Sequence, residues 1–137
     1  MITTAEEFIR LRCSEIPDEY RRAGREEAPY EVWIELIEKH PEMKVWVARN
    51  RTISVELQTI LARDKDWHVR EAIASKYPID RSLYEMLYKD VNEGIRGTIA
   101  YNKKTPLDVL KKMINEDAVE GVRGSAKANY ERQTKNV

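Results

Sequence analysis

The fold is decided by residues 93–117, which read EGIRGTIAYNKKTPLDVLKKMINED. Ile95 and Ile99 stand four residues apart, as on one face of a helix, and a second apolar run with helical spacing follows Pro106. A short break rich in polar residues separates the two runs. The stretch therefore predicts two short helices joined by a turn.

The same pattern recurs along the chain. An apolar residue followed by a basic residue marks each copy, and the four pairs are Met43 and Lys44, Val69 and Arg70, Ile95 and Arg96, and Val122 and Arg123. The intervals between them are 26, 26 and 27 residues. Self-similarity at such a period is typical of a solenoid, in which each unit packs only on its neighbours. The sequence therefore predicts an all-α fold, a short α-solenoid of two-helix repeats with a period of about 26 residues.

Each repeat is expected to contain two short helices. The first helix is predicted at 67–76, 93–102 and 119–129, and the second at 54–63, 80–89 and 105–116. The second helices carry apolar residues four apart, such as Leu83 and Leu87, which predict a buried stripe. Asp80 and Thr105 are expected to cap second helices, with Pro106 in the first turn of the latter.

The chain is predicted to be a single domain with three parts. Residues 1–27 form a polar helical N-terminal cap, residues 28–129 form about four repeats, and residues 130–137 form a polar C-terminal tail that frays. The cap carries acidic residues that could alternatively form a docking surface, namely Glu15, Asp18, Glu19, Glu26 and Glu27. Trp46 is expected to fill space in the first repeat, because its equivalents in the later repeats are small.

Composition narrows the function. The chain has 24 Lys and Arg against 24 Asp and Glu, so no net charge favours a polyanion. Cys13 is the only cysteine and is expected to be a buried, inert thiol. With two histidines besides, the chain has too few ligands for a zinc or iron–sulfur site, and no catalytic set or phosphate-binding loop is apparent. We therefore expect no enzyme activity, no cofactor, no metal and no small-molecule substrate.

The N-terminal residues do not resemble a targeting segment. They read MITTAEEFIR and are acidic and amphipathic, unlike a signal peptide. No apolar run in the chain reaches membrane-spanning length. We therefore expect a cytoplasmic protein that does not enter a membrane.

Two motifs carry a resemblance to a known family. Residues 64–74 match D-x-D-x-x-V-R-x-x-I-A, and residues 102–110 match N-x-x-T-P-x-x-V-L. With their copies, these motifs resemble the leucine-rich repeat variant, a short HEAT-like α-helical repeat, over residues 28–129. The resemblance implies a HEAT-like solenoid but no single function, because such repeats serve many roles. The iron–sulfur module of some relatives is not expected, since its clustered cysteines are missing.

Two polar columns recur one repeat apart. The basic column is Lys44, Arg70, Arg96 and Arg123, and the second column is Asn50, Lys76, Asn102 and Asn129. Each arginine is expected to pair with a loop Asp or Glu and tie neighbouring repeats together, because its planar guanidinium binds a carboxylate through two N–H groups. Alternatively, the basic column forms a strip for phosphates. The asparagines are expected to cap helix ends, using the left-handed conformation that Asn tolerates.

The second helices are expected to line a concave face and to carry the binding site. The candidate partner-binding residues are Tyr84, Tyr88, Glu85, Lys111, Lys112 and Trp67. Tyr84 and Tyr88 stand four apart on one helix and are interpreted as half-exposed aromatics between charges, which is the composition of a binding hot spot. Alternatively, the two tyrosines form the rim of the core. Trp67 stands at a helix start and is expected to be the most exposed tryptophan.

Two function classes remain open. The first is a non-catalytic protein-interaction module that binds a partner protein on the second-helix face, by analogy as a stoichiometric inhibitor or immunity-type protein. The alternative is nucleic-acid binding, because the HEAT-like resemblance extends to DNA-alkylation-repeat proteins, whose repeats cradle duplex DNA. Its phosphate contacts would be Lys103, Lys104, Lys111, Lys112, Arg96 and Arg123. Zero net charge and interleaved acidic residues oppose this alternative. Tyr101 and these lysines do not recur between repeats, so they are better functional candidates than the recurring residues.

Overall fold

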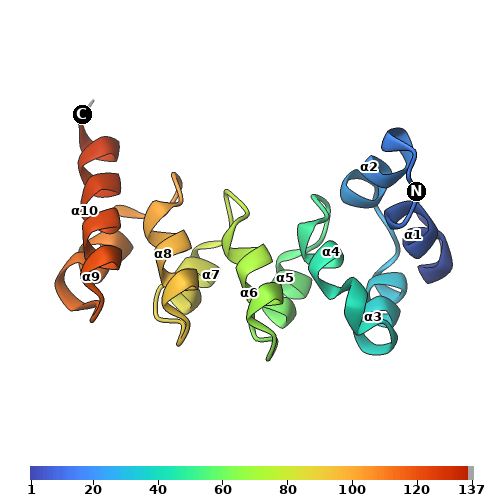
Figure 1. Ribbon diagram of the computed structural model, residues 1–137, viewed down its shortest axis with the longest axis horizontal. Helices are drawn as coiled ribbons and strands as arrows, with labels where there is room; N and C mark the ends of the chain where they lie inside the picture. Colours follow the sequence, from blue (N-terminus) through green and yellow to red (C-terminus); the bar gives the residue numbers. More distant parts are fainter. Residues whose placement is uncertain (136–137) are drawn as a thin grey trace. The chain divides into compact units, whose positions relative to one another are not determined.

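The computed structural model describes residues 1–135 and shows an all-α protein. Ten α-helices and one 3-10 helix account for the regular structure of these residues, and no strand occurs among them (Figure 1). The chain divides into two compact units, one from Met1 to Leu61 and one from Ala62 onward. The predicted cap, residues 1–27, lies within the first unit.

The first unit begins with two capped helices. Its elements are α1 (Ala5–Arg12), α2 (Pro17–Arg25), α3 (Tyr30–Lys39), η1 (Pro41–Met43), α4 (Lys44–Arg49) and most of α5 (Val55–Ala62). The Thr4 side chain caps α1 by accepting a hydrogen bond from the Glu7 amide at 3.0 Å. Phe8 packs edge-on against Trp33, with ring centroids 5.4 Å apart, and both rings are buried. In contrast, α2 buries only Ala23, as expected for a polar cap helix.

The second unit packs five helices around one apolar core. They are α6 (Trp67–Ala74), α7 (Arg81–Leu87), α8 (Glu93–Tyr101), α9 (Leu107–Glu116) and α10 (Glu120–Thr134). α8 contacts α6, α7 and α10, while α9 packs on α10 (Figure 1). The predicted stripe of second-helix residues is confirmed, because Leu83 and Leu87 on α7 and Val109 and Met113 on α9 are at most 1 % exposed. Burying each such side chain contributes about 2 kcal/mol to folding.

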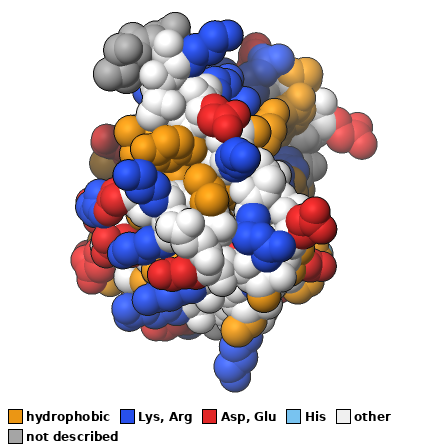
Figure 2. All heavy atoms as spheres, turned by 90° about the vertical axis from the view of Figure 1, so that its left-hand side faces the viewer, with side chains coloured by type: hydrophobic (Ala, Val, Ile, Leu, Met, Phe, Trp, Pro, Cys, Tyr) orange, Lys and Arg blue, Asp and Glu red, His pale blue; other side chains and the backbone are white. Residues whose placement is uncertain are grey.

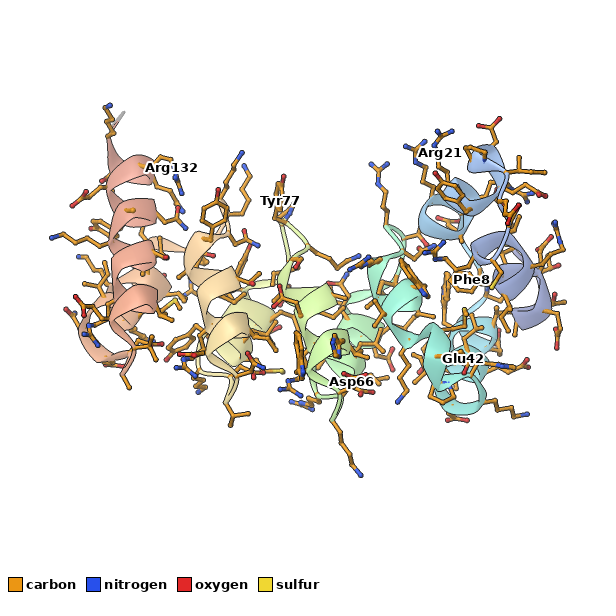
Figure 3. The ribbon with its side chains drawn as sticks, in the orientation of Figure 1. Phe8, Arg21, Glu42, Asp66, Tyr77 and Arg132 are labelled. Atoms are coloured by element: carbon orange, nitrogen blue, oxygen red, sulfur yellow. The ribbon has the colours of Figure 1, made fainter. Side chains whose placement is uncertain are left out.

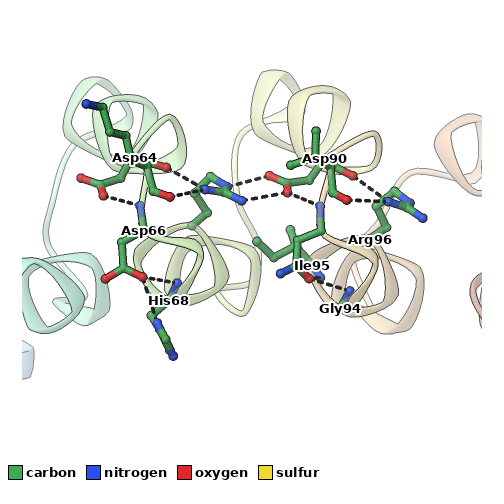
Figure 4. A network of polar contacts seen from close by, with 11 residues as sticks. Asp64, Asp66, His68, Asp90, Gly94, Ile95 and Arg96 are labelled. Carbon is green, nitrogen blue, oxygen red and sulfur yellow. Dashed lines mark hydrogen bonds and ion pairs between the residues drawn. The ribbon is translucent and has the colours of Figure 1, made fainter.

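Arginines join the helix pairs of the second unit. The Arg70 guanidinium lies 2.9 Å from the Asp90 carboxylate and also donates to the carbonyl of Asp64 (Figure 4). Arg96 repeats this arrangement with Asp117 at 2.8 Å and with the carbonyl of Asp90. The expected pairing with loop carboxylates is confirmed for Arg70 and Arg96. Neither of these two guanidinium groups is left to form a phosphate-binding strip. The expected pairing is wrong for Arg123, which donates to the carbonyl of Asp117 instead and forms no ion pair with another described residue.

Buried asparagines make a second set of ties. Asn102 donates to the carbonyls of Ala74 and Lys76, and Asn129 donates to those of Ala100 and Asn102. In the first unit, Asn50 donates in the same way to Ala23 and Glu26. The expected left-handed conformation is wrong. Asn50 and Asn102 are extended, with φ of −65° and −61°, because their side chains reach backbone about 25 residues away instead of closing a local turn.

Two predicted helix ends are wrong. Thr105 does not cap α9, because its hydroxyl is fully buried and donates to the carbonyl of Ile99 at 2.6 Å. Pro106 takes the cap position instead, and the helix begins at Leu107. α10 continues to Thr134, well into the predicted tail, and the Gln133 side chain donates to the carbonyl of Thr105 at 3.0 Å. Residues 136 and 137 of that tail lie outside the described residues.

Candidate functional site

Tyr84 is part of the core and not of a binding surface. Its side chain is 2 % exposed, and its hydroxyl lies 3.3 Å from the Asn102 side-chain oxygen, to which it donates. Burial raises the pKa of this phenol. The expectation of a half-exposed tyrosine is therefore wrong here. On α7, Tyr84 is directed toward α8, because its partner Asn102 follows the end of that helix.

Tyr88 and Lys112 share a surface hollow of about 430 Å³ between the end of α7 and α9. Tyr88 is half-buried and lies at the C-terminal end of α7, while Lys112 extends from α9. Val91 also lines the hollow and is 92 % exposed, more than any other large hydrophobic side chain of the described residues. An aromatic ring, an exposed valine and a lysine thus meet at one place.

A nearly buried ion pair lines this hollow. Arg96 and Asp117 line it, and their side chains are only 16 % and 4 % exposed. Around this fixed pair stand the charged side chains of Lys89, Lys112 and Glu116, none of which forms an ion pair with another described residue. The Lys89 ammonium lies 5.8 Å from the Tyr88 ring, a distant cation–π contact. The hollow therefore offers charges of both signs around an apolar centre.

The other predicted site residues lie elsewhere. Glu85 is exposed and paired with Arg81 at 3.2 Å. Lys111 lies on α9 with its ammonium 5.8 Å from the Tyr130 ring of α10. Trp67 is 47 % exposed, as expected, but it stacks on His68 with centroids 3.8 Å apart and does not line the hollow. Of the six predicted residues, the structure brings together only Tyr88 and Lys112.

One exposed arginine connects α7 with α9. Arg81 forms ion pairs with Glu85 on its own helix and with Asp108 on α9. The Arg81 guanidinium holds the pKa of the Asp108 carboxyl below its usual value. Glu85 is thus paired within this exposed bridge and does not line the hollow.

A second groove of about 450 Å³ lies between the ends of α6 and α8. Tyr77 and Tyr101 line it and are 59 % and 69 % exposed. Tyr77 projects from the loop after α6, and the Arg132 guanidinium on α10 lies 5.9 Å from the Tyr101 ring (Figure 3). Lys103 completes the lining. Sequence comparison between repeats had singled out Tyr101 and Lys103. Tyr77 was missed, although an aromatic residue between Lys76 and Pro78 in a loop is an unusual feature.

The predicted acidic docking surface of the cap is largely neutralised. Glu19 accepts from Arg10 at 2.8 Å, and this contact lowers the pKa of its carboxyl. Arg22 likewise pairs with Glu26 and lowers its pKa. Asp18 pairs with Arg21 at 2.9 Å. Three of the five acids therefore have cationic partners.

The remaining chemical groups define no further centre in residues 1–135. Cys13 is exposed, so the expected buried thiol is wrong, because the residue caps the C-terminal end of α1 beyond its last core residue. No three or more His, Cys, Asp or Glu side chains of the described chain are grouped as metal ligands would be. None of its helices combines the length and the apolar character needed to cross a membrane.

The fold and the two grooves define a small all-α protein with solvent-accessible aromatic sites. No family model, curated protein or solved structure matches this chain. Its function therefore has to be argued from its own residues.

Proposed function

We propose that the protein is a non-catalytic protein-interaction module, a short stack of HEAT-like two-helix repeats that binds a partner protein on the face lined by α7 and α9. The observation that carries this proposal is Val91, 92 % exposed beside Tyr88 at a hollow of about 430 Å³. Burial of this exposed valine by a partner would be favourable and would stabilise the complex. A stoichiometric inhibitor or an immunity-type protein would act in this way.

The recurring polar ties support the stacked-repeat part of the proposal. Arg70 reaches an aspartate 20 residues ahead, and Arg96 reaches one 21 residues ahead. Asn102 and Asn129 reach back 28 and 29 residues to equivalent alanine carbonyls. Contacts repeated at one interval are what a stack of similar units requires, because each unit meets its neighbour through the same surface.

The composition of the hollow supports a protein partner. Interface hot spots combine a partly buried aromatic anchor with charged side chains at its edge. Tyr88 supplies the anchor, and Lys112 and Glu116 supply charges of opposite sign. The nearly buried Arg96–Asp117 pair keeps its part of the hollow ordered before binding, which lowers the entropy lost on association.

The test is affinity capture from the native host with the wild-type chain and with the double variant Tyr88→Ala/Val91→Ser. We expect the variant to retain the partner at least about tenfold less tightly, a loss of about 1.4 kcal/mol. The matched control is Tyr101→Ala, which removes a more exposed tyrosine from the other groove. A partner that the double variant holds at full strength, or that both variants lose equally, would contradict the assignment of the hollow. Circular dichroism checks that each variant stays folded.

Nucleic-acid binding is the second candidate function. Exposed tyrosines beside lysines form the stacking platforms used for single strands, and Tyr77, Tyr101 and Lys103 have this arrangement. However, Arg96 is engaged by Asp117, and Arg123 donates to the carbonyl of Asp117 at 2.6 Å. The surface of α9 and α10 also mixes basic and acidic side chains (Figure 2). These observations favour the protein partner.

A salt titration separates the two functions. Fluorescence anisotropy of labelled single-stranded and duplex oligonucleotides would be measured with the wild-type chain and with Tyr101→Ala/Lys103→Gln. A protein that binds nucleic acid displaces counterions from the phosphates. This displacement becomes less favourable as the salt concentration rises, so the affinity of a nucleic-acid-binding protein would fall steeply. Absence of binding at low salt would remove this candidate.

A further inference from the structure

A third hollow lies entirely within the first unit, between α1, α2 and α4. It has a volume of about 240 Å³, and its lining residues are Arg12, Tyr20, Ala23, Gly24, Trp46 and Arg49. Its walls come from aromatic and small side chains. Its charged groups are both guanidinium groups, and no carboxylate lines it.

Two arginines gather on one indole ring. The Arg12 guanidinium carbon lies 3.4 Å from the centre of the Trp46 ring, and that of Arg49 lies 5.0 Å from it. Cation–π attraction to the indole offsets only part of the repulsion between two positive charges. The Arg12 Nε atom is buried and has no hydrogen-bond partner, which costs free energy. Neither arginine forms an ion pair with any other described residue.

Two further arginines stand next to Gly24, which lines the hollow. Arg25 follows Gly24 directly at the end of α2, and the Arg51 amide donates to the Gly24 carbonyl at 2.9 Å. Both side chains are exposed, and neither is ion-paired within residues 1–135. The unit as a whole is acidic, with 12 Asp and Glu against 9 Lys and Arg in residues 1–61. Four arginines without carboxylates are therefore a local exception in an acidic unit whose other arginines are paired.

We propose that this hollow binds an organic oxyanion, a carboxylate or a phosphate ester carried on a planar apolar body. Guanidinium groups recognise both oxyanions through paired N–H donors, and Arg12 and Arg49 supply them. The rings of Trp46 and Tyr20 supply the apolar contact for the body of the ligand. The site shares no residue with the α7–α9 hollow and does not depend on the proposed protein-binding function.

Gly24 provides a way to close the site without disturbing the fold. Apart from its chain neighbours and the backbone of its own helix, no atom lies within 4 Å of the position that a Cβ would take there, so a larger side chain meets open space. Gly24 also lies in the last turn of α2, and leucine is more favourable than glycine in a helix by about 1 kcal/mol. The variant Gly24→Leu is therefore expected to fold normally and to obstruct the hollow.

The experiment is an NMR titration of the wild-type chain with phenyl phosphate and benzoate, with inorganic phosphate and benzylamine as comparison ligands. The indole N–H signals of Trp33, Trp46 and Trp67 are recorded separately, and Trp46→Phe assigns the signal of Trp46. We expect phenyl phosphate or benzoate to move the Trp46 signal saturably at or below about 10 mM, while Trp33 and Trp67 stay in place. The relative affinities of the two aryl anions tell phosphate from carboxylate.

Variants test the site directly. Arg12→Gln, Arg49→Gln and Gly24→Leu are each expected to weaken the aryl anion about tenfold or more. Arg132→Gln is the matched control, since it removes a guanidinium near another aromatic ring in the second unit and should leave affinity unchanged. No Trp46 shift, a shift that does not saturate, or an equal shift with benzylamine would overturn the proposal. Equal affinity for inorganic phosphate would overturn the apolar contact that we assign to Trp46 and Tyr20.

Discussion

Lys76 is the one residue of its column that is not asparagine. It is partly buried, and burial lowers the pKa of its ammonium from 10.5 to about 8. Below pH 8 the lysine is protonated in both the folded and the unfolded chain, so the cost of burying the charge is fully present. Between pH 8 and 10.5 the unfolded chain binds more protons than the folded chain. The contribution of Lys76 to stability therefore becomes more favourable as pH rises through this window.

The expected result is a difference in pH dependence between two proteins. Urea denaturation at pH 7.5 and pH 10 would be compared for the wild-type chain and for Lys76→Met, which removes the ionisable group but keeps most of the length. Other lysines and tyrosines titrate in both proteins, so their effects cancel in the comparison. Relative to the variant, the wild-type chain should gain unfolding free energy on going to pH 10. Identical changes in both proteins would mean that the pKa of Lys76 is not lowered on folding.

At the residue scale, sequence reasoning predicted that Tyr84 and Tyr88 are both half-exposed, but Tyr84 is buried and only Tyr88 reaches the surface. The spacing of four between Tyr84 and Tyr88 placed both on one face. It could not show that Tyr84 lies within hydrogen-bonding distance of Asn102, 18 residues further on. Burial at the edge of a helix depends on such distant contacts, which periodicity does not contain. Val91 was missed because it lies in a short loop, where no helical pattern indicates whether a residue is exposed.

At the scale of the helices, the two buried ion pairs and the exposed Arg81 bridge allow a direct comparison. Arg96 and Asp117 are nearly buried, whereas Arg81 and Asp108 are 52 % and 54 % exposed. Removing one member of a buried pair leaves a charge without its partner, while an exposed pair is screened by water. We expect Arg96→Gln to lower the unfolding free energy by about 3 kcal/mol. Arg81→Gln should lower it by less than about 1 kcal/mol.

Chemical denaturation of both variants measures this difference. A second control is the double variant Arg96→Gln/Asp117→Asn, which removes both charges and should recover part of the lost stability. If Arg96→Gln and Arg81→Gln lower the unfolding free energy equally, the contribution of these ion pairs to stability does not depend on their burial. The comparison therefore tests whether the recurring arginines hold the helix pairs together.

The helices themselves were largely predictable, but their ends were not. The spacing of Leu83 and Leu87 gave α7 its buried face, because an amphipathic helix must turn that face inward. The end of α10 was missed, since its last turn is held by Gln133 donating to the carbonyl of Thr105. Thr105 was wrongly predicted to cap α9. A threonine before a proline can either cap a helix or bury its hydroxyl, and the local sequence does not distinguish the two. A hydrogen bond between residues 28 apart decided the first of these ends, and one between residues six apart decided the second.

At the scale of the whole molecule, neither proposed site was visible in the sequence as a set. The arginines at Trp46 come from α1 and α4, 37 residues apart, and their neighbour Tyr20 comes from α2. In the second unit, Tyr88 and Lys112 come from different helix pairs. The repeat pattern predicted which residues are needed for packing. It could not predict which of the remaining residues meet at the surface.

The two proposed sites should be separable, because each is built within one compact unit and they have no residue in common. Substitutions in places without shared contacts act independently. We therefore expect Tyr88→Ala/Val91→Ser to weaken capture of the protein partner at least about tenfold while the Trp46 signal still responds to the aryl anion. Arg12→Gln/Arg49→Gln should give the reverse result. Capture assays and NMR titrations on the same four proteins, with the wild-type chain and Tyr101→Ala as references, make this comparison. If the arginine variant also loses the partner, the two sites are not independent, and the assignment of partner binding to the α7–α9 hollow alone is wrong.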